Sequence, residues 1–269
     1  MQDKKQTHFQ LNIMSKAVSA IRLFDNNELK EHKQNIQSNV SFILSKSWNL
    51  IQQVDLDMEK KSGNIIANIS YINKEDIDEA IETMQKSYKL NKKYVNPHFQ
   101  IISHPEDENK VGIATICSLS IDGLLIKNGI KSMPKYGGLL ELTEPPLFID
   151  LISYTGSSID PHKIFIAKDM TSIISDNRPK RLLASLKEIP FVARDHSVYL
   201  LDKLSELGLP IYKIGKPREL TYNAKVDNYY FGLVTGSGLN TIAAIKEKGI
   251  DIEVKATTKL MPFESMDKL

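Results

Sequence analysis

The sequence predicts an α+β fold that is built from two copies of one unit. The main observation is an ungapped match between residues 111–130 and 231–250, an offset of 120 residues, in which five of the twenty pairs are identical. A second observation is that both stretches read as a strand, a short helix and a helix-ending glycine, Gly129 in one and Gly249 in the other. A period this long indicates a duplicated subdomain, because solenoid repeats run from about 20 to 50 residues.

Each unit reads as strand, helix, strand, strand, helix and strand. Period-two alternation of β-branched residues predicts the strands, and apolar residues three and four positions apart predict the helices. In the first unit the elements are a strand at 64–72, a helix that Asn73 caps and that runs to about Tyr88, strands at 98–103 and 110–118, a helix at 120–128 and an extended segment at 130–142. In the second they are a strand at 181–189, a helix from Asp195 to Gly208, strands at 210–215 and 228–236, a helix at 239–248 and a strand at 250–260.

This order is that of the two-layer, ferredoxin-like split motif, βαββαβ, in which two helices cover one face of an antiparallel sheet. We expect N-terminal helices to precede the two copies. The predicted segments are helices at 13–24 and 35–54, an N-terminal tail at 1–36, a large domain at 37–269, and repeats within it at about 60–143 and 180–262.

The segment that joins the two units carries the first candidate site. Asp160 and Pro161 are typical of a helix start and predict a helix over about 161–175. Gly156-Ser157-Ser158 lies directly before it, so backbone amides and two hydroxyls there could hold a carboxylate or a phosphate. The alternative is an ordinary loop with capping residues, which this stretch alone favours. The carboxylate of Asp160 also competes for the same amides.

The second candidate site is a pair of equivalent strand-to-helix corners. Thr115-Ile116-Cys117-Ser118 occupies this position in the first unit, and Thr235-Gly236-Ser237-Gly238 occupies it in the second. In a duplicated protein such corners can face each other, and small-molecule sites commonly lie between subdomains. Their amides, hydroxyls and thiol could bind a small polar ligand. The alternative for Cys117 is a buried and inert thiol, the commoner fate of a single cysteine.

A dicarboxylate ligand at these corners needs cations, and two lysines are candidates. Lys135 lies at the end of the first unit, and Lys187 lies near the end of the first strand of the second. Each lysine alone is weak support, since exposed lysines are usually only solvated. The six histidines show no spacing typical of a metal site or of a Cys–His enzyme. A nucleophilic role for Cys117 would also need a base and an orienting group.

Composition and charge argue against several other classes of protein. The net charge of +2 gives no domain-wide basic excess of the kind that nucleic-acid binding needs. With one cysteine no intrachain disulfide can form, which fits a reducing cytoplasm. No apolar run is close to the length of about 18 residues that a membrane-spanning helix needs. The N-terminus is polar and does not have the pattern of a signal peptide. We expect a cytoplasmic domain without a metal or a bound cofactor.

Several motifs in these segments resemble the regulatory domain of NrpR, the repressor of nitrogen-assimilation genes in methanogenic archaea. The resemblance covers roughly residues 37–262 and rests on Thr115-Ile116-Cys117-Ser118, Asp122-Gly123-Leu124-Leu125, Asn128-Gly129-Ile130, Pro134-Lys135-Tyr136-Gly137-Gly138, Tyr154-Thr155-Gly156-Ser157-Ser158-Ile159-Asp160-Pro161, Met170-Thr171-Ser172, Glu188-Ile189-Pro190 and Gly238-Leu239-Asn240. It implies a domain that senses 2-oxoglutarate, whose binding releases the repressor from its operator. Lys187 stands where the family usually has arginine, and Thr241 stands where it usually has proline.

The corners, the lysines and the resemblance together define the candidate residues for 2-oxoglutarate. They are Thr115, Cys117, Ser118, Lys135, Gly156, Ser157, Ser158, Lys187, Ser237 and Gly238. We expect an effector site near Cys117, Ser118 and the loop at 156–158, and no catalytic residue.

The resemblance also bears on how the protein reaches DNA. Full-length family members begin with a winged helix-turn-helix, whereas about 36 residues precede the domain here, and 23–33 resemble the last helix of such a module. The leading hypothesis is a repressor or co-repressor domain that forms homo- or hetero-oligomers and contacts DNA only through a homologue that carries the DNA-binding head. The alternatives are a self-sufficient DNA-binding repressor and, less favoured, a small-molecule enzyme that uses Cys117.

Overall fold

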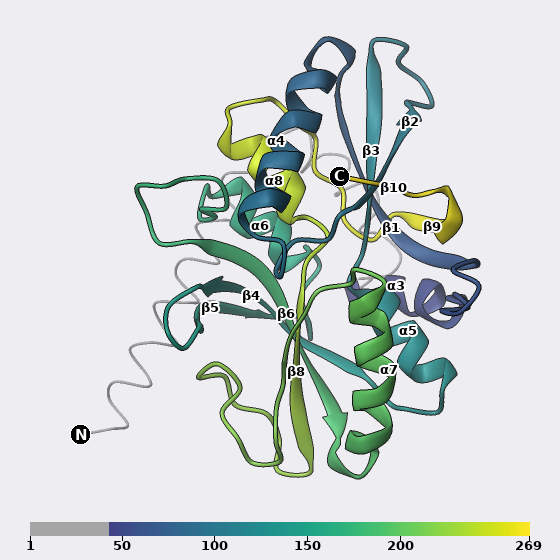
Figure 1. The fold of residues 1–269 in the computed structure, drawn as a ribbon, viewed down its shortest axis with the longest axis vertical. Coiled ribbons are helices and arrows are strands. Elements are labelled where there is room, and N and C mark those ends of the chain that lie inside the picture. The colour runs from purple at the N-terminus through teal and green to yellow at the C-terminus, as the bar shows by residue number, and fades with distance from the viewer. Residues whose placement is uncertain (1–42) are drawn as a thin grey trace. The chain divides into compact units, whose positions relative to one another are not determined.

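The computed structural model describes residues 43–269, which form two five-stranded antiparallel sheets with helices packed against them (Figure 1). The predicted α+β class is confirmed.

The first unit comprises β1 (Asn64–Asn73), α4 (Ile77–Leu90), β2 (His98–Ser103), β3 (Lys110–Ile116), α5 (Leu119–Lys127) and β4 (Met133–Glu141). The second comprises β6 (Arg181–Pro190), α7 (Arg194–Glu206), β7 (Ile211–Ile214), β8 (Tyr230–Gly236), α8 (Asn240–Glu247) and β9 (Lys259–Pro262). The other elements are α3 (Ile43–Gln52), β5 (Leu147–Ser153), α6 (Pro161–Ala167), β10 (Asp267–Lys268) and the 3-10 turns η1 (Lys74–Asp76), η2 (Phe191–Ala193) and η3 (Phe263–Ser265).

The duplicated segments have the same structure. Residues 111–130 and 231–250 each run from a strand through a tight corner into a helix, at the offset of 120 residues that the sequence predicts. Gly129 and Gly249 follow the two helices with left-handed backbone angles, at φ 75° and 92°. Glycine adopts this conformation without the steric cost of a side chain, which explains its presence after both helices.

The first strand and helix of the two units are related by a different offset, 117 residues. In the sheet ladders Ala67 faces Ile116, and Ala184 faces Gly236. The buried residues of α4 and α7 are related by the same offset of 117. Those of α4 are Ala80, Thr83, Met84 and Ser87, and those of α7 are Ser197, Leu200, Leu201 and Leu204. The three-residue difference arises between this helix and the third strand of each unit.

Each sheet contains one strand from the other unit. The strand orders are β10-β2-β3-β1-β9 and β5-β4-β6-β8-β7. The last strand of the first unit, β4, pairs with β6, and the last strand of the second, β9, pairs with β1. The helices that precede these strands are exchanged with them: α8 packs beside α4, and α5 packs beside α7 (Figure 1). The sequence predicts the elements but not this exchange.

Equivalent hydrogen bonds hold the start of the second helix in each unit. Ser120 Oγ accepts from the backbone N–H of Ile66 at 2.9 Å and donates to its carbonyl at 3.2 Å. Asn240 does the same for Leu183, with Oδ1 accepting at 2.8 Å and Nδ2 donating at 3.0 Å. Serine and asparagine each supply both a donor and an acceptor. These side chains therefore fix each helix to the first strand of its own unit before the chain crosses to the other sheet.

The two larger apolar cores both draw on both units. One joins Ile66 and Leu125 of the first unit with Leu201 of the second, and the other joins Met84 with Ile242. Apolar burial contributes roughly 25 cal/mol per Å². Since each unit covers apolar surface of the other, the two fold as one domain.

Two predicted boundaries in this domain are wrong. The helix predicted at 161–175 ends at Ala167, because Asp169 turns the chain at φ 50° and the following amides cap the last carbonyls. The strand predicted at 250–260 begins only at Lys259, because Thr257 interrupts the extended chain at φ 49°. In addition, β5 occupies 147–153, where no strand is predicted.

Part of the N-terminal prediction lies outside the described residues. The helix predicted at 35–54 is described from Ile43 to Gln52 as α3. The helix predicted at 13–24 and the tail at 1–36 fall outside the described range.

A fully buried ion pair joins the exchanged helix α5 to β6. Lys187 Nζ bonds Asp122 Oδ2, and both side chains have no exposed surface. Ser132 Oγ donates to the other oxygen of Asp122 at 2.6 Å. A buried charge left without its partner is strongly unfavourable, so this pair specifies how α5 is placed on the second sheet.

We expect Lys187→Met to lower the free energy of unfolding by about 3–5 kcal/mol, because Asp122 stays buried without its cation. The double variant Lys187→Met/Asp122→Leu should regain most of this loss. Urea unfolding followed by circular dichroism measures both. A Lys187→Met protein as stable as the parent would show that the pair has no structural role.

Candidate functional site

The two equivalent corners face each other, and a small, largely enclosed cavity lies between them. Its volume is about 10 Å³, which is space for about one water molecule. It is lined by Asn68, Cys117, Ser118, Leu119, Tyr154, Asp160, His162, Ser237, Leu239, Ala256 and Thr257. Polar groups from both units and from the segment that joins them therefore converge on one point.

Two equivalent contacts hold the corners together. On one side, Ser118 Oγ lies 3.2 Å from Ser185 Oγ. On the other, Gly238 lies so close to Asn68 and the carbonyl of Ile116 that a Cβ at 238 would overlap this oxygen. Gly238 is the counterpart of Ser118 at the 120-residue offset, and Ser185 is the counterpart of Asn68 at the 117-residue offset. The corners thus meet about a local twofold axis, and a glycine at 238 permits the closer approach.

Tyr154 closes one side of the cavity. It is buried just after β5, and its hydroxyl lies 3.3 Å from Ser185 Oγ. Burial raises the pKa of this phenol well above its usual value, and the nearby carboxylate of Asp160 adds to the shift. The phenol is therefore neutral and serves as a hydrogen-bonding wall of the cavity.

The start of α6 supplies an acid and an imidazole. Asp160 Oδ1 accepts from the backbone amides of His162 and Lys163, at 2.8 and 3.3 Å, and so caps the helix. His162 Nε2 lies 3.1 Å from the carbonyl of Ala184, and it donates because a carbonyl can only accept. Burial lowers the pKa of His162, so the imidazole is neutral near neutral pH.

Cys117 is a buried thiol and not an activated nucleophile. Its Sγ lies 3.5 Å from the hydroxyl of Thr257, and burial raises the pKa of the thiol to about 11. Nucleophilic cysteines have lowered pKa values and a base that orients them. The neighbouring imidazole of His162 is bonded to a backbone carbonyl instead. This geometry favours ligand contact over covalent chemistry.

A buried hydroxyl beside the corners has no partner among the described residues. Thr235 faces Ser185 directly across the β6–β8 ladder, and its Oγ1 makes no hydrogen bond within residues 43–269. Leaving a buried polar group unpaired costs about 1–3 kcal/mol.

The comparison with known proteins identifies the family. Residues 40–268 match the model of the NrpR regulatory domains NRD1 and 2. The chain belongs to this NrpR family. The family resemblance that the sequence motifs carry is therefore confirmed.

Relatives of this NrpR-family domain match most of its length. It is 33% identical over 254 residues to the global nitrogen regulator NrpR of Methanocaldococcus jannaschii, covering 92% of this chain and 44% of that protein. It is 32% identical to the global nitrogen regulator NrpRI of Methanosarcina mazei, covering 90% of this chain and 79% of that protein. The crystal structure of a nitrogen repressor-like protein from Methanococcus jannaschii is also similar, with a TM-score of 0.74 and 33% identity over 86% of this chain and 99% of that one. The chain spans less than half the length of the first of these relatives.

Five of the predicted site residues lie at the corners. Cys117, Ser118 and Ser237 line the cavity, and Gly238 packs against the carbonyl of Ile116, where a Cβ would not fit. Thr115 is buried near the end of β3 and does not line the cavity. Its hydroxyl accepts a hydrogen bond from Asn68 Nδ2 at 3.5 Å. The duplication alone was sufficient to find these residues.

The predicted loop at 156–158 does not line the cavity. Gly156 and Ser158 are exposed, and Ser157 Oγ donates to the carbonyl of Ile159 at 2.6 Å. The flanking residues Tyr154 and Asp160 reach the cavity instead. The cap amides are bonded to Asp160, which is the competition that the sequence suggests.

Both predicted cations are paired with carboxylates. Lys135 bonds Glu188 at 2.5 Å and Asp227 at 3.2 Å. Glu188 points to the opposite face of β6 from Lys187 and Ser185, since side chains alternate along a strand. Lys135 is therefore directed away from the cavity, and its role as a cation for 2-oxoglutarate stays a prediction. Lys187 lies on the correct face but is bonded to Asp122.

The sequence does not predict Asn68, Tyr154, His162 and Thr257 as site residues. Asn68 is the counterpart of Ser185, but the offset of 120 residues hides this relation because the first strands follow the offset of 117. Tyr154 and His162 flank the Gly-Ser-Ser loop, so attention to both ends of this loop could have found them.

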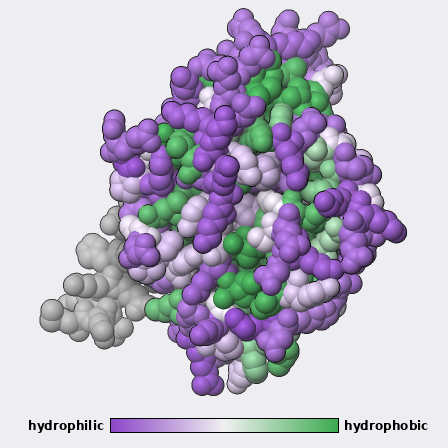
Figure 2. Space-filling model, in the orientation of Figure 1, coloured by the Kyte–Doolittle hydropathy of each residue, from purple (hydrophilic) through white to green (hydrophobic). Residues whose placement is uncertain are grey.

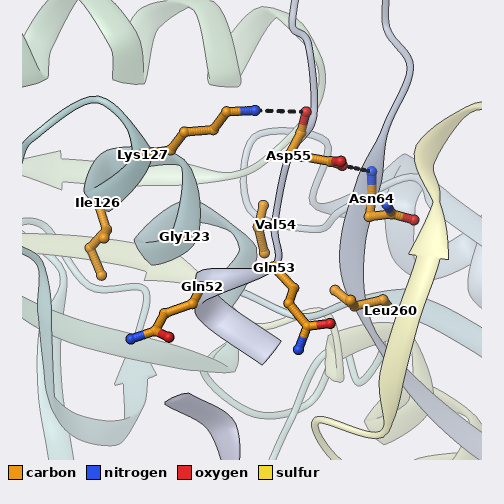
Figure 3. Close-up of a pocket in the computed structure, with 9 residues that line it drawn as sticks. All are labelled: Gln52, Gln53, Val54, Asp55, Asn64, Gly123, Ile126, Lys127 and Leu260. Atoms are coloured by element: carbon orange, nitrogen blue, oxygen red, sulfur yellow. Dashed lines mark hydrogen bonds between the residues drawn. The ribbon is translucent and has the colours of Figure 1, made fainter. Parts of the chain in front are cut away.

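A larger and more open groove lies elsewhere, between α3, α5 and the edge of β1 (Figure 3). It has a volume of about 490 Å³ and is lined by Gln52, Gln53, Val54, Asp55, Asn64, Gly123, Ile126, Lys127 and Leu260. Its charged groups are bonded to the protein: Lys127 Nζ donates to the carbonyl of Asp55 at 3.2 Å, and Asp55 Oδ1 accepts from the amide of Asn64 at 2.5 Å. Its lining comes only from the first unit, α3 and β9, whereas the smaller cavity joins both equivalent corners and is therefore the better candidate.

Within residues 43–269 no three His, Cys, Asp or Glu side chains are close enough to hold a metal ion. In the same residues no helix is long and apolar enough to cross a membrane.

The raised pKa of Cys117 gives a direct test of its environment. With a pKa of about 11, only about one thiol in a thousand is ionised near pH 8, and burial also shields it from reagents. We expect iodoacetamide to leave the native protein unlabelled at this pH and to label it fully after unfolding in urea. Rapid labelling of the native protein, measured by mass spectrometry, would contradict the buried thiol.

Proposed function

We propose that this NrpR-family domain is the effector-sensing module of a transcriptional repressor or co-repressor of nitrogen-assimilation genes, with 2-oxoglutarate as its effector. Membership of the family supports the regulatory role, and relatives are named global nitrogen regulators. The observation that carries the effector proposal is the small cavity, lined by polar side chains, between two strand-to-helix corners. Both units and the segment between them are required to form it.

The residues around the cavity have the chemistry that a dicarboxylate requires. Ser118, Ser237 and Asn68 supply hydrogen-bond donors, and the corners supply amides at helix starts. Lys187 is near enough to act electrostatically on Cys117 and His162. Its positive charge can partly compensate a bound carboxylate while Lys187 stays paired with Asp122.

Two acidic side chains oppose anion binding and make it selective. Asp160 lines the cavity, and Asp122 holds the nearest lysine. A ligand must therefore make enough new bonds to outweigh both carboxylates. A bound carboxylate would also favour the protonated form of His162, which is neutral without it.

Binding requires the corners to separate, because the cavity holds about one water molecule. The corners begin α5 and α8, which pack on different sheets. A ligand shifts an equilibrium only when it binds one arrangement better than the other. We infer that 2-oxoglutarate binds only the separated arrangement and so changes the relation between the two units.

Cys117→Tyr tests the location of the site. The larger ring would fill the space between the corners, so we expect titration calorimetry to show no heat with 2-oxoglutarate, whereas the parent protein binds it. Circular dichroism and thermal unfolding check that the variant is folded.

Ser205→Tyr is the matched control, because Ser205 is exposed on α7 and far from the corner segments in sequence. It should bind as the parent does. An unchanged titration with a folded Cys117→Tyr protein would exclude this cavity, and an absence of binding by the parent would exclude the effector.

We further propose that the domain reaches DNA through a homologue that carries a helix-turn-helix. Residues 43–269 are taken up by the two sheets and their helices. A recognition helix for the major groove must therefore come from another segment or another chain.

In an electrophoretic shift assay at physiological salt, we expect this chain alone to give no operator-specific complex. Adding a homologue with an intact helix-turn-helix should restore the complex. Any residual binding by the chain alone should fall steeply with salt, because it would depend only on phosphate contacts. A sequence-specific footprint by this chain alone would favour the self-sufficient repressor instead.

A further inference from the structure

The wall of the cavity between the corners reaches solvent at one short segment. Of the described residues that line the cavity, Ala256 and Thr257 alone are partly exposed, and all the others are buried. Both belong to residues 254–258, which follow α8 and lead into β9 (Figure 1). We call this segment the strap. The strap is therefore the part of the wall that separates the cavity from solvent.

The first unit has a regular strand where the second unit has the strap. At the offset of 120 residues the counterpart of Thr257 is Gly137, which lies within the β4–β6 ladder. The equivalent ladder, β9–β1, ends at the pair of Lys259 and Ala67. Just beyond it, the backbone N–H of Thr258 donates to the carbonyl of Ala67 at 2.8 Å. The same fold thus allows a continuous strand here, and the second unit departs from it where the chain borders the cavity.

Side chains hold the strap where ladder bonds are missing. The backbone N–H of Thr257 donates to Asn68 Oδ1 at 2.9 Å, and Thr258 Oγ1 accepts from the N–H of Ile69 at 3.1 Å. The hydroxyl of Thr257 also lies 3.5 Å from Cys117 Sγ. Asn68 and Cys117 themselves line the cavity. The strap, which follows the helix of the second corner, is therefore tied to the first corner.

The backbone of Thr257 is strained. Its φ is 49°, in the left-handed region that β-branched residues rarely adopt. Such a conformation costs free energy and persists only where the surrounding contacts impose it. A few side-chain bonds thus hold the strap in place against this strain. Short segments with few such bonds can open while the rest of a domain stays folded.

We propose that the strap is the gate of the effector cavity, and that release of Thr257 from Asn68 and Cys117 admits the ligand. The inference rests on the proposed effector site and names the segment that controls entry to it. Release of the strap removes a tie between the two corners, so the gate opens before the corners separate. Figure 2 shows hydrophilic side chains, with smaller apolar patches between them, on the face where Figure 1 places α8 and β9. The approach to the strap from this face suits a polar ligand.

The single cysteine, Cys117, reports opening of the strap in the absence of any effector. We expect methyl methanethiosulfonate, a small thiol reagent, to modify the native parent slowly, as mass spectrometry measures. Low concentrations of urea should hardly change this rate, because opening of the strap exposes little surface. Thr258→Val deletes the acceptor for the N–H of Ile69 and should raise the rate about fivefold. Thr258→Ser keeps the oxygen and is the matched control, so it should react as the parent does.

Two results would overturn the gate. One is a rate of thiol modification that rises with urea as steeply as global unfolding does, because Cys117 would then be reached only through the unfolded state. The other is a folded Thr258→Val protein that reacts at the rate of the parent.

The effector proposal fails separately from the gate. In stopped-flow mixing, association of 2-oxoglutarate should accelerate in Thr258→Val by the same factor as the thiol reaction. A parent protein that does not bind 2-oxoglutarate would exclude the effector, whereas the thiol reaction would still decide whether the strap controls access to the cavity.

Discussion

Neither sheet is complete without a strand from the other half of the chain. β4 lies inside the second sheet between β5 and β6, and β9 extends the first sheet along β1. Separating the two units would break a ladder in each sheet and open two shared apolar cores. The chain crosses between the sheets through α5 and α8, so the corners that start these helices are forced to meet.

The two halves of this meeting point have diverged in chemistry. Ser118 on one side corresponds to Gly238 on the other, and Lys187 corresponds to the buried Ser70. The lysine is accommodated because Asp122 comes from the exchanged helix α5. Gene duplication thus produced a symmetrical frame, and substitution within it produced one polar cavity with a charge on one side.

The exterior diverged as well. One α-helical face became acidic and solvated in the first unit, while the equivalent face of α7 became apolar at its start and mixed in charge. A fold that tolerates both surfaces does not itself select either one.

The sequence predicts the helices and strands that depend on local residue patterns. The shared glycines and the 120-residue match located β3, α5, β8 and α8, and with them Cys117, Ser118 and the second corner. The exchange of β4 and β9 between the two sheets could not be predicted, because the residue pattern of a strand does not determine which other strand it pairs with. The role of Lys187 was hidden for a similar reason: its partner Asp122 lies on a helix whose placement follows from the exchange.

Hydrogen–deuterium exchange with and without 2-oxoglutarate tests most directly whether the effector acts between the corners. If it does, residues 115–120, 235–240 and 154–162 should all change their exchange rates together, while the groove around Gln52 and Lys127 should not. A change confined to one corner, or one centred on the groove, would contradict the account.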